Sequence, residues 1–157
     1  MDARLVIERL GLEPHPEGGW YRQTWRHEPA EGSRGAGTAI YYLLAAGERS
    51  AWHRVDATEI WHFYAGGPAR MRLHSGVEGD DVTDVVLGPG LAAGEVPQVV
   101  VPERWWQTAA PLGAWALVGC TVSPAFEFDG FELAPADWEP LGRKPSGGEA
   151  PSREAPG

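Results

Sequence analysis

Glycine and proline divide this chain into short segments, and that division limits the possible folds more than any other feature. The sequence holds 21 glycines and 14 prolines, residues that interrupt helices and mark turns. Between these breaks lie runs rich in β-branched and aromatic side chains, such as TAIYYLLA at residues 38–45. Many short strands separated by Gly/Pro turns are typical of a β-sandwich or a β-barrel.

One helix and about ten strands are expected. Asp2 is a suitable N-cap for a helix over residues 3–10, which would end at Gly11. Residues 126–131 alternate aromatic and polar side chains, as an edge strand or a covering flap would. The strands are expected at residues 20–27, 38–45, 50–55, 59–64, 69–74, 82–87, 98–101, 105–109 and 114–122.

The domain organisation follows from composition. An all-β domain with a short N-terminal helix is predicted for residues 1–141. Residues 142–157 are rich in Pro and Gly and poor in apolar side chains, so they are predicted to be a disordered tail.

The charge and the cysteine content exclude several classes of function. A net charge of −9 argues against nucleic-acid binding, which needs a basic surface. No apolar run is long enough to cross a bilayer, so no membrane partner is expected. The single cysteine, Cys120, fits a reducing compartment, and a cytoplasmic location is the default. The only lysine, Lys144, lies in the predicted tail, which argues against Schiff-base chemistry.

The stretch at residues 47–66 carries the most chemistry. His53 and Glu59 lie six residues apart, with a turn expected at residues 55–58. Strands on either side of that turn would direct both side chains into the same interior. An imidazole and a carboxylate that meet in an aromatic pocket can bind a metal, move a proton or hold a polar ligand.

This stretch resembles the first motif of the cupins, G-x5-H-x-H-x3,4-E-x6-G, with Val55 in place of the second histidine. Residues 102–107 resemble the second motif, P-x-G-x2-H, with Gln107 in place of its histidine. The chain is similar in particular to the uncharacterised cupin-5 branch, also called domain of unknown function 985. Three blocks carry this likeness: residues 15–19 with Tyr21, residues 38–66, and residues 118–124 with Phe126, Phe128 and Phe131.

The resemblance implies a double-stranded β-helix, the cupin jelly roll, that is usually a homodimer. It implies a shape related to that of the dTDP-sugar 3,5-epimerases. It implies no particular reaction, because this branch has no established common activity and a fold alone does not determine one.

Two enzymatic interpretations and two others remain open for the site. In the preferred one no metal is needed: His53 acts as general base or acid, Glu59 sets its tautomer, and Gln107 hydrogen-bonds the ligand. The reaction would be an isomerisation, epimerisation or dehydration of a small polar or carbohydrate-like metabolite. The rival is an oxygenase or lyase with a single divalent metal on His53, Glu59, Gln107 and water. The pair would otherwise hold a ligand without catalysis, or only close the barrel.

Other side chains are candidate pocket residues. Trp61 and Phe63 share the face of Glu59 on a regular strand and would line the cavity. Residues 15–19 form either a lid whose Glu17 reaches the pocket or a tight turn. Tyr21 and Arg22 are candidates for a second proton-transfer group and an anion contact. His62 is expected on the opposite side of its strand, at the surface or at a subunit contact.

Overall fold

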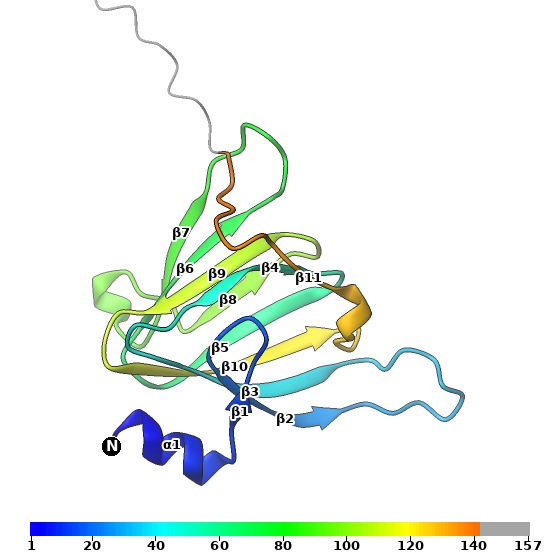
Figure 1. Ribbon diagram of the computed structural model, residues 1–157, viewed down its shortest axis with the longest axis horizontal. Coiled ribbons are helices and arrows are strands. Elements are labelled where there is room, and N and C mark those ends of the chain that lie inside the picture. Colours follow the sequence, from blue (N-terminus) through cyan, green and yellow to red (C-terminus); the bar gives the residue numbers. More distant parts are fainter. Residues whose placement is uncertain (142–157) are drawn as a thin grey trace, which may run out of the picture.

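The computed structural model describes residues 1–141, and its regular elements are almost all strands (Figure 1). A single α-helix, α1 (Ala3–Leu10), precedes them. Two short 3-10 helices, η1 (Leu91–Ala93) and η2 (Phe128–Gly130), interrupt the later part of the chain. The strands are β1 (Glu13–Pro14), β2 (Trp20–Arg26), β3 (Thr38–Ala45), β4 (Ser50–Val55), β5 (Thr58–Gly66), β6 (Ala69–His74), β7 (Thr83–Leu87), β8 (Gln98–Val101), β9 (Trp106–Pro111), β10 (Trp115–Ser123) and β11 (Phe131–Leu133).

These strands form two antiparallel sheets that pack face to face. One sheet has the order β1-β2-β3-β10-β5-β8 and the other the order β11-β4-β9-β6-β7. Strands β4 and β5 follow each other in sequence but belong to different sheets, so the turn between them crosses from one sheet to the other. Neighbours such as β3 and β10 come from distant parts of the chain, as they do in a jelly roll. The predicted all-β jelly roll is therefore confirmed.

The main core lies between the sheets. It contains large apolar side chains from both, including the fully buried Tyr42, Trp61 and Met71. Alternate residues of β3 face opposite sides, because successive side chains of a strand do so. Tyr42 and Leu44 belong to this core, whereas Leu43 packs on the other side of the sheet against α1.

Helix α1 covers the outer face of the six-stranded sheet. The Asp2 side chain accepts a hydrogen bond from the backbone N–H of Leu5, at 2.9 Å. Gly11 ends the helix in the left-handed conformation, with φ of 63°. Val6 is the buried helix residue and packs beside Leu43. The predicted helix, with both of its ends, is confirmed.

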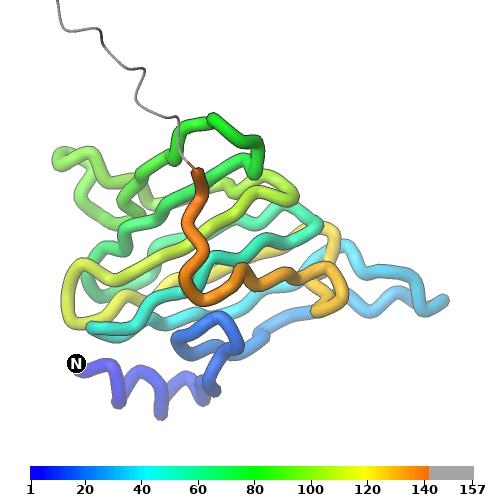
Figure 2. Tube along the Cα trace, turned by 45° about the horizontal axis from the view of Figure 1, so that its top comes forward, coloured from blue at the N-terminus to red at the C-terminus, as the bar shows by residue number. Residues whose placement is uncertain are grey.

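The C-terminal part of the described chain crosses the outer face of the five-stranded sheet (Figure 2). Trp138 packs there against Trp52 and Trp106, with ring centroids 5.7 and 4.7 Å apart. The predicted tail at 142–157 lies outside the described residues. Among residues 1–141, no helix has the length and apolar character needed to cross a membrane.

Candidate functional site

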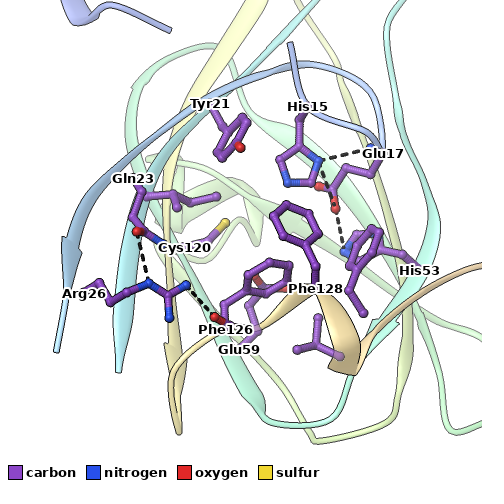
Figure 3. A pocket seen from close by; sticks show the side chains of 13 residues that line it. His15, Glu17, Tyr21, Gln23, Arg26, His53, Glu59, Cys120, Phe126 and Phe128 are labelled. Atoms are coloured by element: carbon purple, nitrogen blue, oxygen red, sulfur yellow. Dashed lines mark hydrogen bonds and ion pairs between the residues drawn. The ribbon is translucent and has the colours of Figure 1, made fainter. Parts of the chain in front are cut away.

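One cavity of about 190 Å³ opens between the two sheets (Figure 3). It is lined by the loop at residues 15–19, by strands β2, β3, β4, β5 and β10, and by residues 126–131. Its polar lining consists of His15, Glu17, Tyr21, Gln23, Arg26, His53 and Glu59. Its apolar lining consists of Ile40, Val55, Cys120, Phe126, Phe128 and Phe131. His53 comes from one sheet and Glu59 from the other, so the cavity is built by the packing of the sheets.

The two ring nitrogens of His53 both have partners. Nδ1 lies 2.7 Å from the backbone carbonyl of Ala51. A carbonyl only accepts hydrogen bonds, so Nδ1 carries the proton in this tautomer. Nε2 lies 3.1 Å from Oε2 of Glu17, and both side chains are buried. The residue that holds the imidazole from its second side is therefore Glu17.

Glu17 and His53 share one proton. A deprotonated Nε2 and a carboxylate oxygen are both acceptors, so contact at 3.1 Å requires a proton between them. Burial raises the pKa of Glu17 to about 8, although hydrogen bonds from Tyr42 and Ser50 oppose the shift. Burial also lowers the pKa of His53. At neutral pH the proton therefore belongs to Glu17, which donates it to a neutral imidazole.

Residues 15–19 bring Glu17 into the cavity because two glycines let this loop approach the sheets closely. A Cβ on Gly18 would lie 2.3 Å from the carbonyl oxygen of Arg49, and both Gly18 and Gly19 have positive φ. The backbone N–H of Ala51 donates to the carbonyl of Glu17 at 2.7 Å, which joins the loop to β4.

His15 belongs to the same loop and contributes a neutral ring. Its Nδ1 accepts a hydrogen bond from the backbone N–H of Glu17 at 3.1 Å, so the ring proton sits on Nε2. Burial, with the nearby His53 as a smaller cause, lowers the pKa of His15 to about 4. The ring therefore offers the cavity a hydrogen-bond donor without a charge.

Glu59 is held by a separate chain of hydrogen bonds. The Trp61 indole N–H donates to Oε1 of Gln107 at 2.8 Å, and Nε2 of Gln107 donates to Oε1 of Glu59 at 2.7 Å. An indole can only donate, which fixes the orientation of the Gln107 amide. Burial raises the pKa of Glu59 to about 7, although attraction to His53 opposes the shift.

The structure corrects the predicted contact between His53 and Glu59. Within residues 1–141 Glu59 forms neither a hydrogen bond nor an ion pair with His53; Glu17 and the Ala51 carbonyl hold the ring instead. A turn with a strand on either side was predicted; those strands, β4 and β5, lie in different sheets, so the two side chains enter the core from opposite sides. Both still line the one cavity.

The other predicted pocket residues divide into two groups. Glu17 and Tyr21 line the cavity. Gln107 and Trp61 lie behind Glu59 and support it, and Phe63 packs against the main core. Arg22 lies outside, over the ring of Tyr41. His62 faces away from the core, where it contacts Thr121 and Gln98.

Sequence reasoning gave no role to three polar lining residues, His15, Gln23 and Arg26. His15 stands in a block that carried the family likeness, which was a usable signal. Arg26 gave no such signal, because strict alternation along β2 puts it on the same face as Arg22. The strand register shifts between Gln23 and Trp25, and this bulge turns Arg26 to the cavity side.

The predicted metal ligands do not fit a metal centre. Gln107 would bind a metal through its carbonyl oxygen, but that atom accepts the Trp61 N–H. Both nitrogens of His53 are engaged as well. The part of the chain described here, residues 1–141, has no cluster of three or more His, Cys, Asp or Glu side chains arranged to hold a metal ion. The hydrogen bonds of Gln107 and His53 would have to break before either side chain could bind a metal.

The buried carboxyl groups should make stability depend on pH. In the unfolded chain Glu17 and Glu59 both have a pKa of 4.5. In the folded protein the pKa of Glu59 is about 7 and that of Glu17 is about 8. The unfolded state then binds fewer protons, so stability falls as pH rises. The lowered pKa of His15 has the opposite effect on stability, but only below pH 6.5, which is the pKa of this histidine in the unfolded chain. We expect the free energy of unfolding, measured by urea denaturation, to fall by about 2–3 kcal/mol from pH 6.5 to 8.

The Glu17→Gln variant should show about a third of that decline, because the group it removes has the higher pKa and carries the larger share. An equal decline in the variant and in the wild type would show that Glu17 is ionised throughout this range.

Comparisons with known proteins place the chain in a family. Residues 4–134 match the model of the cupin superfamily branch DUF985. A crystal structure of a protein from Shewanella oneidensis is 44% identical with a TM-score of 0.80, over 85% of each chain. A hypothetical protein from Leishmania major is 30% identical with a TM-score of 0.76, over 85% of this chain and 88% of that one.

More distant structures agree in fold alone. A dTDP sugar isomerase from Desulfovibrio desulfuricans is 19% identical with a TM-score of 0.56, over 80% of this chain and 88% of that one. No curated protein sequence matches the chain significantly. The match over residues 4–134, together with the two-sheet fold, shows that this chain belongs to the cupin superfamily, in the DUF985 branch.

Proposed function

We propose that this cupin catalyses acid–base chemistry on a small polar metabolite, of the isomerase, epimerase or dehydratase type. The observation that carries the proposal is the pair Glu17–His53, which shares a proton at 3.1 Å in the same cavity as Glu59. Titratable groups in one pocket whose pKa values are moved towards neutrality are characteristic of acid–base sites.

The two carboxyl groups have different roles in this proposal. Glu59 accepts a proton from a carbon beside a carbonyl group, because Gln107 occupies only its Oε1. The proton shared by Glu17 and His53 leaves this contact and moves from Glu17 to the carbonyl oxygen, and it returns to Glu17 when the carbon takes up a proton again. Return of a proton to a different carbon or to the other face gives an isomer or an epimer, with no net change in atoms.

The size of the cavity restricts the substrate. Its volume of about 190 Å³ lies below the range of about 300–1,000 Å³ that holds drug-sized ligands. A small metabolite fits, whereas a nucleotide-linked sugar would leave most of its bulk outside. The aromatic side chains of residues 126–131 give the ligand an apolar wall.

Deuterium exchange tests the proposal without knowledge of the product. Ketoses, aldoses and hydroxy acids of about three to six carbons, a size range chosen for the cavity, are incubated with the protein in D₂O. The loss of C–H signals is then followed by proton NMR. We expect exchange into at least one of them, and a fall of about 10²–10⁴-fold in the rate for Glu59→Gln.

The control is His62→Gln, which alters a histidine of the same strand that faces away from the core. This variant should exchange at the wild-type rate. Saturable binding of a compound that never exchanges would contradict the enzymatic proposal and favour the ligand-binding interpretation. The homodimer and the cytoplasmic location stay predictions.

A further inference from the structure

The bulge in β2 places a cation at the cavity. Gln23 pairs with Ile40 of β3, but Trp25 pairs with Ala39, so one extra residue is accommodated between them. Side chains beyond the bulge change face, and Arg26 lines the cavity together with Tyr21 and Gln23. Bulges that redirect a side chain in this way are common beside active sites.

The guanidinium group of Arg26 is held in place and still has free donors. Its Nε donates to Oε1 of Gln23 at 3.3 Å, and its Nη2 donates to the carbonyl of Phe126 at 2.6 Å. Two of the five guanidinium N–H groups are thus engaged, which leaves three for a ligand. Figure 3 shows Arg26 on the opposite side of the cavity from the Glu17–His53 pair.

Arg26 has no carboxylate partner among the described residues, although it lies at the cavity. Arg34, Arg54 and Arg70 each pair with an aspartate or glutamate, whereas Arg22 lies outside the cavity over the ring of Tyr41. Within residues 1–141 Arg26 forms no ion pair, and it is the one Lys or Arg side chain that lines the cavity. A half-buried cation without a counter-ion is suited to an anionic ligand group.

We propose that Arg26 binds the anionic end, a carboxylate or a phosphate, of a small organic acid whose other end lies between Glu17 and Glu59. This proposal rests on the proposed function, because it names the substrate class of the same site. The mainly protonated state of Glu17 at neutral pH keeps that end of the cavity from repelling an anion.

Methyl NMR provides a direct test, because the chain has three isoleucines and one lines the cavity. The full-length protein, labelled with ¹³C at isoleucine methyl groups, is titrated with glycerate, with glycerol and with inorganic phosphate. We expect the Ile40 signal to move with glycerate at a Kd about 10- to 100-fold lower than with glycerol. Ile7 and Ile60 report on the helix and on β5, and their signals should stay in place.

Two substitutions separate a ligand contact from a structural role of Arg26. Arg26→Gln should remove the preference for glycerate over glycerol while the Ile7 and Ile60 signals remain those of the folded protein. Arg26→Lys keeps the charge without the planar fork, and it should retain part of the preference. Arg22→Gln is the matched control, because Arg22 lies on the same strand outside the cavity, and it should change nothing.

The outcomes are distinct. Phosphate that competes with glycerate at Ile40 would identify a phosphate-bearing ligand, whereas phosphate without effect would identify a carboxylate. Equal binding of glycerate and glycerol, no Ile40 response to either anion, or a preference that persists in both Arg26 variants would overturn the proposal. If deuterium exchange fails but the NMR titration succeeds, the protein is an anion-binding cupin without the proposed activity. If the titration fails but exchange succeeds, the protein is an enzyme for a neutral substrate.

Discussion

Glu17→Gln should lower the rate of the proposed reaction by about 10²–10⁴-fold, the contribution typical of a positioned acid or base. The amide has nearly the shape of the acid, so the loop should keep its place through the bond between the Ala51 N–H and the Glu17 carbonyl. It retains a hydrogen-bond donor for Nε2 of His53 but has no proton to transfer. The rate constants from deuterium exchange or turnover of the substrate found by the screen would measure this loss.

The pH profile distinguishes loss of the acid from general damage. The wild type should be active between an acidic limb near the Glu59 pKa of about 7 and an alkaline limb near the Glu17 pKa of about 8. Glu59 must be ionised and Glu17 protonated for the two proposed roles, so the active range is narrow. The residual activity of Glu17→Gln should keep the acidic limb and lose the alkaline one.

A Glu17→Gln variant with the wild-type rate would remove Glu17 from the mechanism and return the acid role to His53. Loss of rate with an unchanged alkaline limb would mean that Glu17 only positions His53. His62→Gln again serves as the control for a polar change outside the cavity.

Trp61→Ala should cost about 3–5 kcal/mol of stability, the range for a fully buried tryptophan. Trp61 is 1% exposed and packs edge-on against Tyr42, with ring centroids 5.6 Å apart. Its removal also leaves Gln107 without the donor that orients it. Urea denaturation followed by circular dichroism would measure the change, and the melting temperature should fall by about 10–20 °C.

Two further variants make this result specific. Trp61→Phe keeps most of the ring volume but not the N–H, so we expect an intermediate loss of about 1–3 kcal/mol. Trp25→Ala removes a tryptophan that is 51% exposed and should cost less than about 1 kcal/mol. Similar unfolding midpoints for Trp61→Ala and Trp25→Ala would contradict the central role of Trp61 in the core.

The strands were largely predictable from local sequence. Predicted and observed bounds agree for residues 38–45, 50–55, 69–74 and 98–101. Strand preference and Gly/Pro turns act over a few residues, so a local pattern contains this information. The short β1 was missed because its pairing of Pro14 with Trp20 depends on the loop that folds back between them.

The candidate site was predictable only in part. The spacing of His53 and Glu59, together with the family likeness, predicted that both side chains reach one interior. The sequence did not predict that Glu17 is the partner of His53, because the two side chains meet only when the loop at residues 15–19 packs on β4. An anion contact was expected from Arg22, but the bulge gives the cavity position to Arg26.

The amino-acid sequence by itself determined the β-rich class, the capped helix, most of the strand bounds and the family. Tertiary structure alone decided which acid meets which base, since proton sharing needs atoms about 3 Å apart, as in Glu17 and His53. Contacts at that distance depend on loop closure, sheet assignment and a one-residue change of register, and none of these leaves a periodic signal in the chain.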